Sequence, residues 1–339
     1  MPVSTCPTVA LATGCPAGIG AELAAYVLSS SDLPANGRLI VFGDTRVLEK
    51  GAKALGVVPR AHILTKGETI PSAAGSYFVD LANLDPATIP VGTYSEGASA
   101  FAVETFSAAI DLGISGEADA VAWTPFNKAC MRLTHPGYED EIVFTAEKTG
   151  YKGAASEFNI LPNLWNARVT SHVPISRVAA LITFDAVMRS LRLTHQAMRE
   201  SGFANPRIAL AALNPHAGDG GNFGREEIDV LEPVAVAARK EGILCDGPFP
   251  SDTVFVRAQR GDYDAVLTMY HDQGQIAMKL IGFEAGVTLL GGFAFPLVTA
   301  AHGSAYDIAY KGVANPGAMM NAMAIAFRMA DARKKAKAA

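Results

Sequence analysis

Short apolar runs rich in β-branched residues alternate along the chain with longer segments whose apolar positions recur at helical spacing. The first run, Val9–Thr13, is followed by a glycine-containing loop and by a helical pattern over Ala21–Leu28. Such alternation is typical of α/β proteins with a largely parallel sheet. The other runs that we expect to form strands are Arg38–Phe42, Ala120–Trp123, Ala167–Thr170, Arg207–Ala212 and Ala265–Met269.

Composition narrows the class of protein. The chain has 339 residues, of which 50% are hydrophobic and 18% charged, which is enough for a large core in one bilobal unit or two intimate domains. A net charge of −5 without a long basic run argues against a nucleic-acid partner. The segment Ala285–Tyr306 lacks charged residues, but several glycines and Pro296 interrupt it, so we expect no membrane span. Four scattered cysteines and no signal-peptide pattern predict a cytoplasmic protein.

Three of the seven histidines follow predicted strands in polar, turn-rich contexts: His172, His216 and His271. Ligands of open α/β sheets bind beyond the carboxyl ends of the strands. Imidazole is a common ligand of zinc and similar ions, and three protein ligands leave a position open for substrate. The spacing matches no short metal motif, however, so histidines bonded to backbone at strand ends remain an alternative.

Five segments resemble the 4-hydroxythreonine-4-phosphate dehydrogenase family of vitamin B6 synthesis, in the same order and over essentially the whole chain. The resemblance implies a bilobal architecture like that of isocitrate and isopropylmalate dehydrogenases, with largely parallel sheets and a central cleft. We expect residues 1–130 plus 282–339 to form a nucleotide-binding lobe, and residues 131–281 to form the metal, substrate and dimerisation lobe. The similar segments are Leu11–Leu23, Thr170–Ile175, Leu213–Asp229, Gly247–Phe255 and Met269–Lys279.

The same resemblance implies roles for individual residues. His172, His216 and His271 correspond to the family's metal-binding histidines, so a divalent metal is expected, with zinc as the first candidate and magnesium or another ion as alternatives. In that family the site lies at a dimer interface and the third histidine comes from the partner subunit. We therefore expect a homodimer with a shared active site. Lys279 is expected to anchor an anionic substrate group during catalysis, and Asp272 to orient a ligand histidine.

A second signal lies near the carboxyl end of the chain. The segment from His302 to Pro316 resembles the adenosine-binding loop of isopropylmalate and isocitrate dehydrogenases, although Tyr310 stands where those enzymes usually carry glycine. Asp307 would accept hydrogen bonds from the ribose and repel a 2′-phosphate, which predicts NAD as the cofactor. A loop that caps a helix near Pro316 is the alternative. The predicted cofactor-binding residues are His302, Gly303, Ser304, Asp307 and Asn315.

A glycine-rich loop, Gly14–Gly20, also follows the first predicted strand. Its spacing differs from the GxGxxG fingerprint, and Pro16 lacks a backbone donor. In the family the loop reads Gly-Asp-Pro-Ala-Gly-Ile-Gly, so Cys15 replaces an acid. We interpret this loop as a tight structural turn rather than a phosphate-binding loop.

The chain departs from the family at the positions that recognise substrate phosphate. Glu141 and Ile142 stand in place of a histidine and a threonine, unless a shifted alignment puts Tyr138 opposite the histidine. Thr288 and Leu297 correspond to an asparagine and an arginine, so a bidentate phosphate contact is lost. Lys128 is a further candidate substrate residue, with a solvated turn lysine as the alternative.

From these features we predict an NAD-linked, divalent-metal-dependent dehydrogenase. Its substrate would be the secondary alcohol of a small hydroxy acid or diol carboxylate, and loss of carbon dioxide would follow if the product were a β-keto acid. The first alternative is the standard oxidation of 4-phosphohydroxythreonine in pyridoxal phosphate synthesis. A phosphate acyltransferase-like enzyme and a non-catalytic binding protein are alternatives from other classes.

Overall fold

The computed structural model describes residues 5–338 and divides into two compact units. Unit 1 combines the residues up to 154 with those from 293 onward, and unit 2 comprises residues 155–292. The sequence predicts boundaries at 130/131 and 281/282, whereas the structure divides the chain at 154/155 and 292/293. The division of nucleotide and substrate binding between the two units stays a prediction.

Unit 1 contains a sheet whose strand pairs are all parallel. Every residue of its central strands β1, β2 and β5 is buried, because helices cover both faces. In sheet order, the strands are β3 (His62–Thr65), β4 (Gly75–Asp80), β2 (Arg38–Gly43), β1 (Thr8–Ala12), β5 (Ala120–Trp123) and β12 (Leu297–Ala300).

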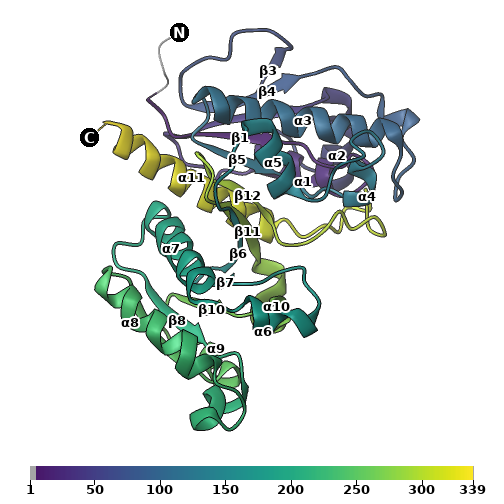
Figure 1. The fold of residues 1–339 in the computed structure, drawn as a ribbon. Coiled ribbons are helices and arrows are strands. Elements are labelled where there is room, and N and C mark those ends of the chain that lie inside the picture. The colour runs from purple at the N-terminus through teal and green to yellow at the C-terminus, as the bar shows by residue number, and fades with distance from the viewer. Residues whose placement is uncertain (1–4, 339) are drawn as a thin grey trace. The chain divides into compact units, whose positions relative to one another are not determined.

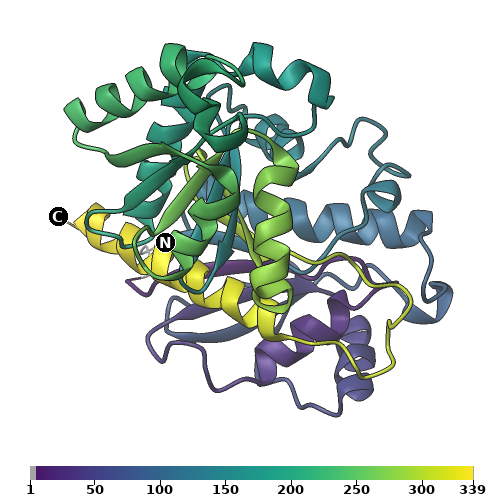
Figure 2. The ribbon, with the colours of Figure 1, turned by 90° about the horizontal axis from the view of Figure 1, so that it is seen from below.

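The helices of unit 1 have clear local signals. Asp44, Ser95 and Asp140 each accept a hydrogen bond from a first-turn amide of the helix that follows, while α2, α3 and α5 end at glycines in the left-handed conformation. Helix α11 packs along β12, β5 and β1 (Figure 2). The helices are α1 (Gly20–Ser29), α2 (Thr45–Leu55), η1 (Pro86–Thr88), α3 (Glu96–Ser115), α4 (Lys128–Met131), α5 (Glu141–Thr149) and α11 (Gly317–Ala338).

Unit 2 contains a mixed sheet. Its first three strands in sheet order pair antiparallel, and the pairs from β7 to β9 are parallel. In sheet order, the strands are β11 (Val287–Gly291), β6 (Ser156–Leu161), β7 (Leu164–Arg168), β10 (Ala265–Thr268), β8 (Arg207–Ala211) and β9 (Leu244–Phe249).

Helices of unit 2 cover this sheet (Figure 1). Helix α7 contacts β6, β7 and β10, whereas α9 contacts β10 and β8. The helices are η2 (Ile175–Arg177), α6 (Val178–Leu181), α7 (Phe184–Glu200), η3 (Pro215–Gly221), η4 (Glu227–Leu231), α8 (Glu232–Lys240), α9 (Ser251–Gln259), α10 (His271–Gly282) and η5 (Phe283–Ala285).

The α/β class and the largely parallel pairing confirm the expectation from the sequence pattern. Strands β1, β2, β5, β8 and β10 and helix α1 lie within two residues of their predicted bounds. The predicted strand Ala167–Thr170 is wrong at its start, because β7 begins at Leu164 directly after a tight turn from β6. Among residues 5–338, none of the helices combines the length and apolar character needed to span a bilayer.

Candidate functional site

The three candidate metal ligands lie at the carboxyl ends of neighbouring strands in unit 2. Strands β7, β10 and β8 are adjacent and parallel, so their carboxyl ends meet at one edge of the sheet. His172 follows β7, His271 opens α10 after β10, and His216 follows β8. The sheet order therefore brings together segments that are far apart along the chain.

Two of these histidines are neighbours. The ring centroids of His172 and His271 are 5.7 Å apart. Asp272 Oδ1 lies 2.6 Å from Nδ1 of His271, which orients that ring and leaves its Nε2 available to a ligand. The strand ends are tied together, because Thr170 donates from its amide and its hydroxyl to the carbonyl of Met269 at 3.1 and 2.8 Å. Asp272 is thus close enough to His271 to orient its ring, as predicted.

The start of α10 is held against the sheet by Gln273 and Gly274. Gln273 accepts a hydrogen bond from the Met269 amide and donates one to the carbonyl of Ala212, both at 2.7 Å, so it links the ends of β10 and β8. Gly274 lies so close to the buried Asn166 that an added Cβ would be 2.1 Å from its Oδ1. A glycine is therefore required where α10 crosses the sheet.

His216 lies in a turn of unusual backbone conformation. Residues 216–220 all have positive φ, beginning with φ 52° and ψ 32° at His216. Such strain is held by surrounding contacts and concentrates at functional sites. Glu227, which is buried, accepts hydrogen bonds from the amides of Leu213 and Asn214 at 2.8 Å and fixes the entry to this turn.

The His216 ring contacts Phe223, whereas the rings of His172 and His271 contact each other. Within residues 5–338, no three histidine, cysteine or acidic side chains of the chain approach one another closely enough to hold a metal ion. The structure thus brings together two of the three predicted ligands. The expectation that a second copy supplies one histidine stays a prediction.

Arg168 is a residue near this edge that the sequence analysis missed. Its buried guanidinium donates to Asn159 at 2.6 Å and to the hydroxyl of Ser171 at 3.0 Å, and it forms an ion pair with Glu157 at 2.9 Å. Because Ser171 precedes His172, Arg168 braces the loop that carries this histidine. An arginine at the end of an otherwise apolar run was the available signal.

The predicted substrate residues are divided between the units. In unit 2, Lys279 is exposed on α10, and Thr288 is half-buried on β11 opposite Asn159. In unit 1, Lys128 is exposed as the first residue of α4, and Leu297 is fully buried in β12.

Glu141 and Ile142 are half-buried in the first turn of α5. Burial raises the pKa of Glu141, and the nearby Lys128 ammonium opposes that rise. The Tyr138 hydroxyl beside this carboxyl group is buried. This corner of unit 1 therefore places a carboxyl group with a raised pKa near a lysine.

The segment 302–316 of unit 1 contains polar atoms without protein partners among the described residues. His302 Nε2 and Ser304 Oγ are both buried and unpaired. The space beside Gly303 is open, and Asp307 is exposed. Asn315 accepts a hydrogen bond from the Gly317 amide at 2.9 Å, so the alternative role of capping α11 is also present in this segment.

The loop Gly14–Gly20 packs against this segment. The Ile19 amide donates to the Ser304 carbonyl at 3.0 Å, and a Cβ on Gly18 would lie 2.4 Å from that oxygen. The Cys15 thiol lies 3.1 Å from the Tyr306 hydroxyl. Hydrogen bonds with Cys130 and Tyr306 lower the pKa of Cys15 to about 7, although burial opposes this. The loop thus supports the segment 302–316.

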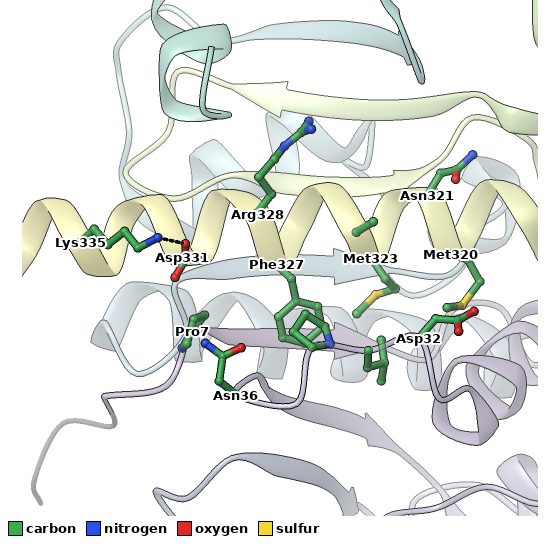
Figure 3. Close-up of a pocket in the computed structure, with 13 residues that line it drawn as sticks. Pro7, Asp32, Asn36, Met320, Asn321, Met323, Phe327, Arg328, Asp331 and Lys335 are labelled. Carbon is green, nitrogen blue, oxygen red and sulfur yellow. Dashed lines mark ion pairs between the residues drawn. The ribbon is translucent and has the colours of Figure 1, made fainter. Parts of the chain in front are cut away.

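Unit 1 also contains an open groove of about 630 Å³ between α11 and the chain before β2 (Figure 3). Met320, Met323 and Phe327 contribute apolar surface, and Asp331 pairs with Lys335 at its edge at 2.6 Å. None of the predicted site residues lines this groove.

The chain has a known α/β fold. A β-decarboxylating dehydrogenase from Thermococcus kodakarensis has the same fold, with a TM-score of 0.51, 17% identity, and coverage of 94% of this chain and 82% of the other. That likeness concerns the fold alone. More specifically, the chain belongs to the pyridoxal phosphate biosynthetic protein PdxA family, whose model matches residues 35–326.

Relatives and solved structures agree with this assignment. A Rhizobium meliloti protein with the provisional name 4-hydroxythreonine-4-phosphate dehydrogenase 2 is 48% identical over 98% of this chain and 96% of its own length. An Oceanobacillus iheyensis protein, provisionally named D-threonate 4-phosphate dehydrogenase, is 34% identical over 96% and 99%. These relatives are named as dehydrogenases, and the chain is an oxidoreductase of this class, acting on CH–OH groups.

Two solved structures illustrate the range of the fold. The Klebsiella pneumoniae 4-hydroxythreonine-4-phosphate dehydrogenase matches with a TM-score of 0.81 and 30% identity, over 97% of this chain and 99% of the other. A terephthalate 1,2-cis-dihydrodiol dehydrogenase from Burkholderia xenovorans matches with a TM-score of 0.66 and 29% identity, over 95% and 97%.

Proposed function

We propose that this chain is a cytoplasmic, homodimeric dehydrogenase that uses NAD and a divalent metal to oxidise the secondary alcohol of a small hydroxy acid. The observation that carries the proposal is the His172–His271 pair, oriented by Asp272 at the carboxyl ends of two parallel strands. Family membership supports the reaction class.

The donor set suits a divalent metal. Neutral imidazoles are common ligands of zinc, and a carboxylate behind a ligand histidine is a frequent supporting contact. His172 and His271 would hold the ion, with the third histidine supplied across the dimer. When bound, the ion would lower the pKa of the substrate alcohol and stabilise the developing carbonyl. Lys279, on the same helix as His271, would bind an anionic group of the substrate.

The segment 302–316 suits the adenosine half of NAD. The unpaired His302 Nε2 and Ser304 Oγ supply buried polar atoms, and open space at Gly303 allows a flat base to approach the backbone. The exposed Asp307 carboxylate would accept hydrogen bonds from the ribose and repel a 2′-phosphate. This supports NAD over NADP.

Exposed apolar side chains on α10 support the dimer. Ile276 and Leu280 lie one helical turn apart and are 60% and 83% exposed. They share the helix with His271 and Lys279, so a second copy that covers them would also approach the candidate metal ligands. A shared site would then add a third histidine to the His172–His271 pair.

Two substrate classes follow from different observations. The names of the relatives support a four-carbon hydroxy acid 4-phosphate, such as 4-phosphohydroxythreonine or D-threonate 4-phosphate. The chain's own residues favour an unphosphorylated hydroxy acid or diol carboxylate as the second candidate. Leu297 is fully buried, and Asp140 and Glu141 occupy the start of α5, where an anion would otherwise bind. Burial raises the pKa of Glu141, so the repulsion of a phosphate by this carboxyl group would weaken as the pH falls.

The test measures NADH formation by the metal-loaded enzyme with three groups of substrates: phosphorylated four-carbon acids, unphosphorylated four-carbon acids and cis-diol carboxylates. Release of carbon dioxide is measured in parallel. Turnover of the phosphorylated acids alone supports the first class, and turnover of the unphosphorylated acids alone supports the second. We expect His271→Ala to lose metal and activity, whereas His62→Ala, on the exposed strand β3, retains both. Absence of NAD reduction with every substrate would refute the proposal.

A further inference from the structure

We infer that Glu22 is a positioning residue for nucleotide binding, because its buried carboxylate holds the 302–316 segment in its receptive shape. This inference rests on the proposed role of that segment in binding NAD. Glu22 belongs to α1, far from the segment in sequence, and its carboxylate joins this helix to the turn that contains Tyr310 and Gly312.

The carboxylate is shared between two amides of one turn. Glu22 is fully buried. Its Oε2 accepts a hydrogen bond from the Tyr310 amide at 2.7 Å, and its Oε1 accepts one from the Gly312 amide at 3.2 Å. Figures 1 and 2 both show this part of the chain running beside α1 and α2. Each oxygen thus satisfies one backbone donor of the turn.

The turn needs such support because its backbone is unfavourable. Tyr310 has a φ of 58°, a left-handed conformation that a bulky residue rarely adopts. Gly312 also has positive φ, and a Cβ there would lie 2.5 Å from the Ala54 carbonyl. Without the two hydrogen bonds, the strained residue would favour another conformation, and the segment would change shape.

The Tyr310 side chain adds two contacts to the same arrangement. Its hydroxyl donates to the Pro16 carbonyl at 2.6 Å, and the Lys50 ammonium lies 4.5 Å from the ring centroid. The residue that replaces the glycine of related enzymes therefore connects the Gly14–Gly20 loop with the nucleotide segment. The backbone of Tyr310 depends on Glu22 to make this connection.

Among residues 5–338, the buried Glu22 carboxylate accepts hydrogen bonds only from the two amides of this turn. Burying a carboxylate in this way is costly, so we infer that the shape of the turn matters. Burial raises the pKa of Glu22, and the hydrogen bonds from Tyr310 and Gly312 oppose the rise. Replacement by glutamine keeps the size of the side chain but turns one acceptor into a donor that faces an amide. One of the two amides would then lose its partner while the core packing is retained.

The experiment compares wild-type protein with Glu22→Gln, using Glu96→Gln as a matched control. Glu96 is exposed in the first turn of α3, so its replacement should change neither property measured. Hydrogen exchange without nucleotide should show faster exchange at the amides of Tyr310 and Gly312 in Glu22→Gln. NAD titration should show about 10-fold weaker binding, equivalent to about 1.4 kcal/mol. The kcat at saturating NAD should stay within about twofold.

The outcomes separate this inference from the proposed function. Unchanged exchange at the two amides overturns the inference whether or not the protein binds NAD. Faster exchange with unchanged NAD affinity also overturns it, because the turn would then not serve the nucleotide. If wild-type protein binds no NAD, the proposed function fails, and the role of Glu22 in nucleotide binding fails with it. Should Glu22→Gln not fold, Glu22→Asp withdraws both oxygens while keeping the charge, and it should weaken NAD binding in the same way.

Discussion

Gly274→Ala offers a test of how α10 positions the His172–His271 pair. An added Cβ would lie 2.1 Å from Oδ1 of Asn166, far inside normal contact distance. Asn166 is fully buried and donates to the Val266 carbonyl at 3.1 Å and to the Thr268 hydroxyl at 3.3 Å. Either these contacts break or the start of α10 moves away from the sheet.

Three effects determine how much Gly274→Ala should change the free energy of unfolding. Overpacking a buried site costs about 1–3 kcal/mol. Each weakened hydrogen bond of Asn166 costs about 1 kcal/mol more. The higher helix propensity of alanine stabilises the variant by at most about 1 kcal/mol. We therefore expect Gly274→Ala to lower the free energy of unfolding by about 2–3 kcal/mol and, because His271 begins the displaced helix, to weaken metal binding at least tenfold.

Urea denaturation and metal titration measure the two effects, with Gly282→Ala as the control in the same helix. A Cβ on Gly282 would meet only the end of the Leu161 side chain, at 3.1 Å, so its stability should stay within about 1 kcal/mol of wild type. Wild-type stability and metal affinity in Gly274→Ala would refute the steric argument. Lower stability with unchanged metal affinity would refute the link from α10 to the metal site.

Three further predictions concern the dimer, the cofactor and pH. Leu280→Asp should give a monomer in analytical ultracentrifugation and weaker metal binding in a metal titration. Val256→Asp, which changes another exposed apolar position in unit 2, should leave the dimer and the metal affinity unchanged. A dimer in both variants would contradict the proposed interface. Asp307→Ala should lower the preference for NAD over NADP, measured as the ratio of kcat/KM values, at least tenfold, and an unchanged ratio would remove Asp307 from the nucleotide site. Burial raises the pKa of Glu141 above its ordinary 4.5, so the free energy of unfolding should fall as the pH rises from about 4.5 through the raised pKa. Denaturation at a series of pH values should show a smaller fall for Glu141→Gln. Identical pH profiles for the two proteins would contradict the raised pKa.

Much of the fold could be predicted because strands and helices have local signals. The apolar runs of β5 and β10 are short, lack charged residues and are followed by polar turns, and these features need no knowledge of the partner strands. The start of β7 could not be predicted in this way. Leu164–Asn166 form a strand because they pair with β6 across a tight turn, and that pairing depends on the sheet.

The candidate site was predictable only in part. His172, His216 and His271 stand in polar segments after apolar runs, and the family resemblance identifies them together. The contact between His172 and His271 depends on the adjacency of β7 and β10, which local patterns do not specify. Arg168 gave a weak signal, because a single charge at a strand end is common on protein surfaces.

Sequence by itself determined the α/β class, the family and the positions of the histidines, because these depend on local patterns and extended motifs. Tertiary structure decided which groups meet: His271 with His172, Asn166 with Gly274, and Glu22 with the Tyr310 turn. The last contact spans 288 positions of the chain. Contacts over such separations form only when packing brings the segments together, so no local pattern records them.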